Sequence, residues 1–135
     1  MLKKYLKNQK GLTLIELLAV IVILGIIAAI AVPSIGKLID NTKDNAKVAE
    51  AIQIIDAARL AHASKSSQIE WTHTGDNADN IYLVDYLDSV NETGYKVTYD
   101  SDTKTYSISD HSATGIVGGE GTDSITEVEL ERYLD

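Results

Sequence analysis

The 135-residue chain has no cysteine and no phenylalanine, and it contains a single proline and a single tryptophan. Without cysteine it cannot form disulfide bonds, thiolate nucleophiles or cysteine-ligated zinc sites. This absence leaves the redox compartment undetermined, because such chains occur on either side of a membrane. Residues 37–68 also lack proline and glycine, so no helix-breaking residue interrupts that stretch.

Basic residues are scarce beyond the first eleven positions. The chain has 12 Lys plus Arg against 20 Asp plus Glu, a formal net charge of −8. Four of the lysines and no acid lie in residues 1–11, so the remainder has 12 − 4 = 8 bases against 20 acids, or −12. A surface this acidic repels phosphate, and we therefore expect no direct binding of nucleic acid.

Residues 17–36 form a run of twenty residues without a charge. As a helix this run is about 30 Å long, close to one hydrocarbon thickness of a bilayer. The lysines before it predict a cytoplasmic N-terminus and an extracytoplasmic acidic part. Two simple interpretations are a secretory signal, with a small-residue cleavage site at Ala29–Ala31, and a plain membrane anchor. Neither explains Gly11 and Glu16.

The stretch Lys10–Glu16, KGLTLIE, resembles the processing site of type IV prepilins and pseudopilins. In that family a dedicated peptidase cuts after the glycine and methylates the new N-terminal amine. The resemblance implies cleavage between Gly11 and Leu12, N-methylation of Leu12, and an assembly role for Thr13 and Glu16. Leu12 stands where the family usually has Phe or Met, and the paired C-terminal cysteines of many members are missing.

The charge of Glu16 can also be considered on physical grounds. A carboxylate facing lipid costs ~3 kcal/mol on insertion scales, so Glu16 requires a partner unless it lies at the membrane surface. Cleavage creates an amine at Leu12, four residues away, which Glu16 can meet within one chain. The amine can also pair with Glu16 of a neighbouring copy, and the family resemblance implies this second arrangement.

Gly25 and Pro33 disturb the apolar helix. Glycine lowers helix stability by ~1 kcal/mol relative to alanine, and proline removes a hydrogen bond to the carbonyl of Ala29, which predicts a kink or local break. The pair is similar to the glycine and proline that lie at the two ends of a melted stretch of helix in assembled pili of this family. An ordinary proline kink is the alternative interpretation.

The pattern beyond the apolar run predicts one helix from about residue 12 to about residue 66. Its second half is amphipathic, and we expect it to be covered by a small antiparallel sheet, which gives an α+β, pilin-like fold. The predicted buried side of this part is Ile35, Leu38, Ile39, Ala46, Ala49, Ile52, Leu60 and Ala63.

The C-terminal half has weaker signals. Residues 95–99 and 105–109 alternate and predict a β-hairpin whose Tyr95, Val97, Tyr99, Tyr106 and Ile108 share the face against the helix. Residues 75–77 predict a turn, 81–90 a helical turn, 115–117 a third strand, and Thr126 with Glu129 the capping box of a closing helix.

No constellation of catalytic residues is present, and we expect no enzymatic activity, no cofactor and no metal. His62, His73 and His111 are scattered in the sequence, and His73 near Asp76 and Asp79 is typical of a solvated loop. The turn at Asp100 and Asp102 lacks the glycine and glutamate of a calcium loop. The 118–123 loop could hold calcium, as in some secretion pseudopilins.

The sequence thus predicts a leader at 1–11, a membrane or filament-core helix at 12–36 and an extracytoplasmic domain at 37–135. We expect a homo-oligomeric filament subunit that meets prepilin peptidase and an assembly machinery. It would reside in the bacterial cytoplasmic membrane, with its N-terminus in the cytoplasm, before it joins an extracellular filament. Alternatives are a pseudopilin of a type II secretion or competence DNA-uptake machine, and a signal-anchored extracellular binding module.

Overall fold

A computed structural model describes residues 2–73 and 82–135, with side chains described from Thr13 onward. The predicted turn at 75–77 and Asp76 and Asp79 lie outside the described residues. The chain divides into two compact units, residues 1–41 and residues 42–135. Each unit is described by itself below.

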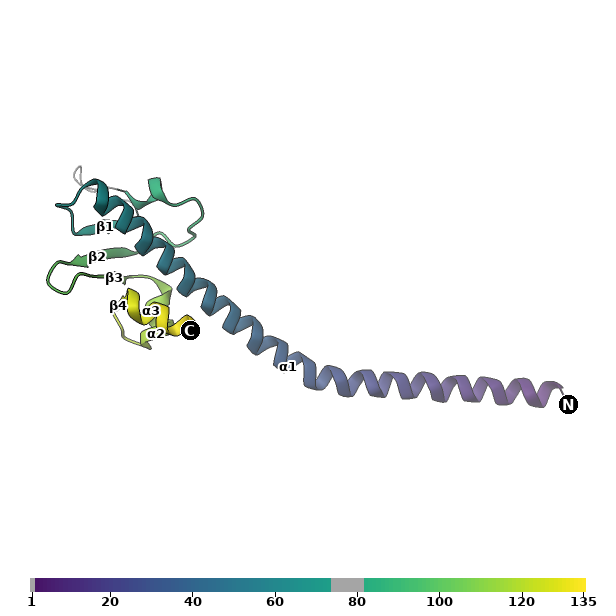
Figure 1. The fold of residues 1–135 in the computed structure, drawn as a ribbon. Helices are drawn as coiled ribbons and strands as arrows, with labels where there is room; N and C mark the ends of the chain where they lie inside the picture. Colours follow the sequence, from purple (N-terminus) through teal and green to yellow (C-terminus); the bar gives the residue numbers. More distant parts are fainter. Residues whose placement is uncertain (1, 74–81) are drawn as a thin grey trace. The chain divides into compact units, whose positions relative to one another are not determined.

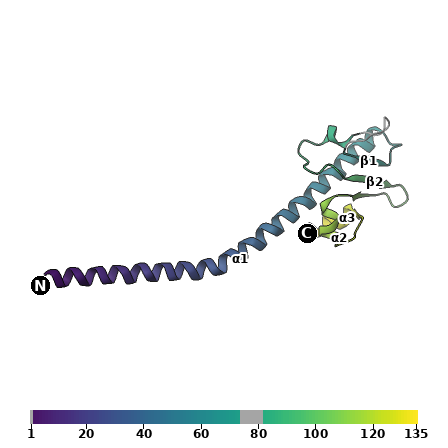
Figure 2. The same cartoon turned by 180° about the vertical axis from the view of Figure 1, so that it is seen from behind.

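Helix α1 runs from Leu2 to Ser64 and therefore passes through both units. The helix predicted for residues 12–66 is confirmed, and it starts ten residues earlier than expected. It ends where the hydroxyl of Ser64 donates to the carbonyl of Ala61 at 2.7 Å. The helix continues through Pro33 without interruption (Figures 1 and 2), and the predicted melting between Gly25 and Pro33 concerns the assembled filament and stays a prediction.

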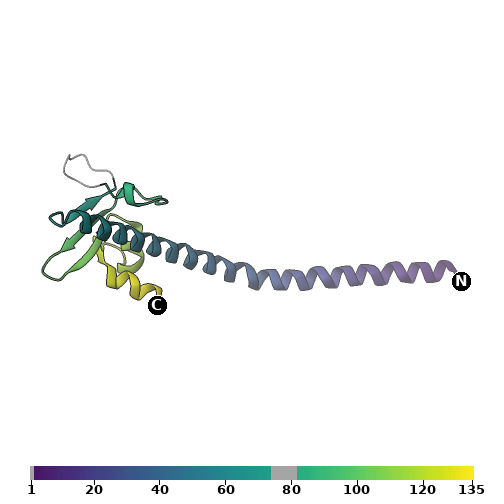
Figure 3. The ribbon, with the colours of Figure 1, turned by 45° about the horizontal axis from the view of Figure 1, so that its top comes forward.

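The second unit contains a four-stranded antiparallel sheet in the order β1-β2-β3-β4, and Figure 3 shows the last part of α1 crossing it. The strands are β1 (Glu70–Thr72), β2 (Lys96–Asp100), β3 (Thr105–Ser109) and β4 (Ser124–Thr126). The predicted hairpin is confirmed as β2 and β3, with Val97 opposite Ile108 and Tyr99 opposite Tyr106. This sheet and α1 confirm the α+β class.

The short helices are η1 (Leu83–Tyr86), α2 (Ser112–Gly118) and α3 (Glu127–Leu134). The helical turn near 83–86 and the closing helix with its capping box are confirmed. Glu129 Oε2 accepts the backbone N–H of Thr126 at 2.9 Å. The strand predicted at 115–117 is wrong, because these residues belong to α2, whose N-cap is His111. The strands β1 and β4 were not predicted.

The predicted buried side of α1 is wrong for most of the second unit, although Ile52 does pack against the core. Leu60 is 59% exposed, whereas Val48, Ile54 and Ile55 are fully buried. Residues 46–63 are apolar on most sides, so periodicity alone leaves the buried face ambiguous. The bulky β-branched side chains determine it because they bury the most area. They share one core with side chains from every strand: Trp71, Val97, Ile108 and Ile125.

Candidate functional sites: the N-terminal segment and a polar cluster

The residues proposed for processing lie in the first unit. The backbone of Gly11 and Leu12 belongs to α1, and their side chains lie outside the described part. Thr13 and Glu16 are exposed on the same helix. Glu16 directly precedes the uncharged run that begins at Leu17, so its carboxylate lies at one end of an apolar stretch of helix.

The apolar side chains of this unit are exposed within the chain. Leu14 is 69%, Ile23 56% and Ile39 48% exposed, although a soluble helix normally buries such residues. The helix is long and apolar enough to cross a membrane. Exposure is shared by all the large apolar residues from 14 to 39: Leu14, Ile15, Leu17, Leu18, Val20, Ile21, Val22, Ile23, Leu24, Ile26, Ile27, Ile30, Val32, Ile35, Leu38 and Ile39.

Packing contacts within the described part of the first unit do not explain why residue 25 is glycine and residue 33 is proline. A Cβ at Gly25 would meet no atom within 4 Å, so packing inside the chain does not select glycine. Pro33 has no N–H to donate within the helix. One turn around it, the Ser34 hydroxyl donates to the carbonyl of Ile30 at 3.1 Å. This bond goes to Ile30 and not to Ala29, whose carbonyl lacks the N–H of residue 33, and such back-bonding often bends helices.

Comparison with known proteins concerns the same segment. A family profile described as the prokaryotic N-terminal methylation motif matches residues 6–32. The chain has a prepilin-type N-terminal segment. The match contains Gly11, Leu12, Glu16 and Gly25, and it ends one residue before Pro33. The resemblance seen in the sequence is thereby confirmed for this segment.

Relatives of the prepilin-type segment bear fimbrial names. The chain is 37% identical over 70 residues to the type IV major fimbrial protein FimA of Dichelobacter nodosus strain VCS1703A, which covers 52% of this chain and 41% of that protein. A second FimA of Dichelobacter nodosus is 37% identical over 68 residues, covering 50% and 40%. The chain thus spans less than half the length of these relatives. No solved structure matches.

The second unit contains a polar cluster, formed by Lys47 and Glu50 of α1, Glu92 of the segment before β2, and His111 at the start of α2. Nζ of Lys47 lies 3.0 Å from Glu50 Oε2 and 3.4 Å from Glu92 Oε2. Nε2 of His111 lies 3.0 Å from Glu92 Oε2, and the His111 side chain is fully buried. That Nε2 atom lacks a well-directed hydrogen bond, so the contact is electrostatic.

Among the described residues, Glu50, Glu92 and His111 come closest to a metal-binding set, with ligand atoms within 4.8 Å of one another. The hydrogen bonds argue against that use. Nδ1 of His111 accepts the N–H of Ala113 at 3.1 Å, which assigns the proton of the neutral ring to Nε2. A protonated Nε2 has no lone pair for a metal. Lys47 already contacts both carboxylates, so the cluster fits an ion-pair network.

Burial and charge shift the pKa values of this cluster. Burial lowers the pKa of His111 below its usual value, and the neighbouring carboxylates only partly offset this. Burial alone would raise the pKa of Glu92, but hydrogen bonds from Ser112, the charge of His111 when its ring is protonated and the charge of Lys47 outweigh it and lower the pKa. At neutral pH His111 is therefore neutral and Glu92 is ionised.

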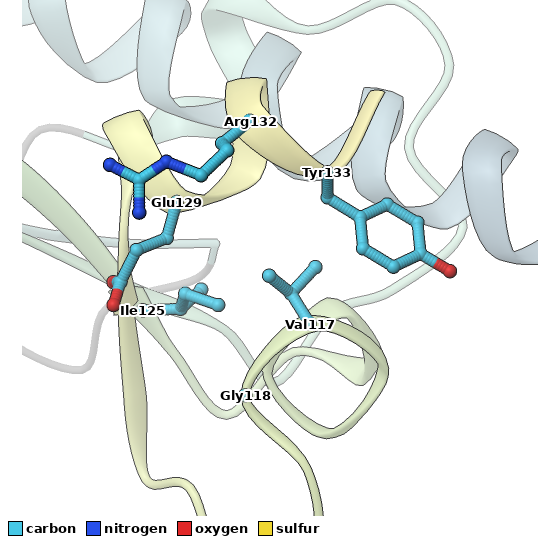
Figure 4. Close-up of a pocket in the computed structure, with 6 residues that line it drawn as sticks. All are labelled: Val117, Gly118, Ile125, Glu129, Arg132 and Tyr133. Carbon is cyan, nitrogen blue, oxygen red and sulfur yellow. The ribbon is translucent and has the colours of Figure 1, made fainter. Parts of the chain in front are cut away.

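Figure 4 shows a surface cavity of about 300 Å³ between α2, β4 and α3. Val117, Ile125 and Tyr133 give it an apolar lining, while Glu129 and Arg132 line its polar side. The carboxylate of Glu129 is already used by Thr126 in the capping box. The cavity therefore has an apolar lining, but its carboxylate is not available as one half of an acid–base pair.

The remaining residues singled out in the sequence have local structural partners. Nδ1 of His62 lies 2.8 Å from the Tyr106 hydroxyl, and Nδ1 of His73 lies 3.0 Å from the Tyr95 hydroxyl. Asp100 Oδ1 accepts the N–H of Asp102 at 2.8 Å, which is ordinary turn chemistry. Sequence reasoning missed the polar cluster, because residues 50, 92 and 111 are far apart in the chain and form no motif.

Proposed function

We propose that this chain is the precursor of a structural subunit of a type IV pilus or pilus-like filament. Prepilin peptidase cleaves it between Gly11 and Leu12, and the new amine of Leu12 is methylated. The observation that carries the proposal is the coincidence of two features in residues 6–39. The methylation motif covers the proposed cleavage position, and α1 exposes all its large apolar side chains from Leu14 to Ile39.

The exposed apolar helix requires two successive environments. Its first environment is the bacterial cytoplasmic membrane, where lipid covers the side chains and the leader lysines favour a cytoplasmic N-terminus. Its second is the interior of a homo-oligomeric filament, where the same side chains meet other copies of the helix. The assembly machinery moves the subunit from the first environment to the second.

Glu16 sets the axial position of one subunit relative to the next by pairing with the amine of the neighbouring copy. After cleavage, the amine of Leu12 lies one helical turn before Glu16, about 6 Å along the axis. An amine of one copy that reaches Glu16 of its neighbour neutralises two charges that lipid and apolar side chains solvate poorly. Thr13, beside the new N-terminus, belongs to the same contact.

A pilus is favoured over a secretion or DNA-uptake pseudopilin by one observation. The prepilin-type segment is common to both classes, but the matched relatives are named major fimbrial proteins. The distinction can be tested by imaging, since a major pilin forms abundant long filaments.

Glu16→Gln tests the proposed pairing. We expect the variant to insert and be cleaved normally, while filament yield falls at least about tenfold, because a pair worth ~1.4 kcal/mol changes an association constant tenfold. Filaments sheared from cells are quantified against the membrane-bound pool. Glu131→Gln removes an exposed carboxylate in the second unit and serves as the matched control. Wild-type yield from Glu16→Gln would refute the pairing.

A further inference from the structure

We propose that His111 and Glu92 form a proton-controlled latch, which holds the segment before β2 and the start of α2 against α1 and releases them in acid. The latch consists of Lys47, Glu50, Glu92 and His111. It lies wholly in the second unit and does not depend on the proposed filament function.

The latch accepts hydrogen bonds from four backbone amides, which lie in two separate segments of the chain. Glu50 Oε1 on α1 accepts the N–H of Asn91 at 2.9 Å and of Glu92 at 3.3 Å. Glu92 Oε1 accepts the N–H of Ser112 at 2.8 Å, and His111 Nδ1 accepts that of Ala113 at 3.1 Å. Three side chains thus bind four amides, two in the segment before β2 and two in the first turn of α2, and each link depends on an unprotonated acceptor.

A proton on His111 breaks one of these links directly. The free lone pair of the ring is on Nδ1, so a second proton must bind there, where it would face the N–H of Ala113. The side-chain N-cap of α2 is then lost. Burial of the ring also disfavours its charge, since the side chain is fully buried.

The other charged groups around the ring do not cancel this effect. From α1, Glu50 attracts an imidazolium and Lys47 repels it, and from the segment before β2, Glu92 attracts it. The Tyr95 ring lies 6.3 Å from the His111 ring, and burial together with Glu50 raises the pKa of Tyr95 to about 12, so it stays neutral. The Tyr95 hydroxyl in turn contacts His73.

The direction of the pH effect follows from these shifts. The folded pKa of His111 is below its unfolded value of about 6.5, so the unfolded chain binds the proton more readily. Its contribution to stability is complete above about pH 6.5 and is lost as the pH falls towards the folded pKa. The lowered pKa values of Glu50 and Glu92 add a second loss below about pH 4.5.

Release of the latch changes a specific surface. Leu87 and Val90, just before the latched amides, line a cavity of about 410 Å³ against Ala57 and Leu60 of α1. Detachment of Asn91 and Glu92 frees the outer wall of this cavity while β2 and β3 keep their pairing. The latch therefore controls the segment that contains Leu87 and Val90, while the sheet stays in place.

Amide hydrogen exchange of the full chain in detergent micelles tests the latch, read by NMR as protection factors at about pH 7.5 and about pH 5. We expect the amide of Ala113, which donates to His111, to lose protection at least about tenfold at the lower pH, relative to paired β2 and β3 amides. The amides of Asn91, Glu92 and Ser112 donate to carboxylates, so we expect them to lose protection only when the measurement is repeated below about pH 4.5. Equal protection ratios at both pH values would overturn the proposal.

His111→Asn is the matched variant, because an asparagine oxygen can still cap α2 but does not titrate in this range. We expect its Ala113 amide to keep the same protection at both pH values. A loss as large as in the wild type would show that His111 is not the sensor. Ring nitrogen shifts in the wild-type chain give an independent readout. The Nε2–H form at neutral pH should disappear with the amide protection, and an Nδ1–H form would contradict the latch.

Discussion

The two units of the chain use the same kinds of apolar residue for opposite purposes. In residues 42–135, Val48 and Ile54 of α1 are fully buried against Trp71 and the sheet. In residues 1–41, Ile23 is 56% and Ile27 57% exposed. The second unit builds an apolar core within the chain, whereas the apolar side chains of the first need lipid or other molecules to cover them.

This difference shows that the two halves of one helix are suited to two kinds of contact, one with the sheet of the same chain and one with other molecules. In the second unit the mixture of Ala with Val and Ile leaves room for a sheet to approach one face. In the first unit the large apolar residues surround the helix, with Glu16 as the only charge between Thr13 and Gly36. An apolar surface without a preferred face suits several neighbours at once, and we propose that its one carboxylate sets their register.

The largest effect should come from the buried face of α1. Ile54→Ala should lower the free energy of unfolding of the second unit by ~2–5 kcal/mol, because it leaves a cavity in the core. Leu60→Ala, at a 59% exposed position on the same helix, is the matched control and should change it by less than ~0.5 kcal/mol. Denaturant unfolding monitored at Trp71 measures both. Equal losses would show that the two sides of the helix are not distinguished.

A smaller effect should come from Gly25 in the first unit. Gly25→Ala has open space for its Cβ and should stabilise the helix by ~1 kcal/mol without changing the second unit. If the filament needs glycine at this position, for close contact between copies or for local melting of the helix, filament yield falls even though the isolated helix is more stable. Gly36→Ala, where space is equally open, is the control. Unchanged filaments from Gly25→Ala would leave glycine without an assembly role.

Local signals allowed much of the fold to be predicted from the sequence. The hairpin follows from alternation that sets Val97 opposite Ile108, and the closing helix from the capping box of Thr126 and Glu129. The prepilin-type segment was recognisable for the same reason, because its motif is linear and lies within residues 6–32.

Other features depend on distant partners and could not be predicted. Ile116 and Val117 favour a strand by propensity, but the cap from His111 starts a helix there. Strands β1 and β4 have three residues each, too few to show alternation. The latch joins Glu50, Glu92 and His111 only after the sheet has folded onto α1.

The mass of the N-terminal peptide, from protein recovered at the surface of the cells that make it, tests the central claim most directly. We expect a chain that begins with N-methylated Leu12, because the exposed apolar helix and its carboxylate require a new amine beside Glu16. A chain beginning at Met1 would indicate a simple anchor, and one beginning at Val32 a secretory signal. Either result would contradict assembly through the processed helix.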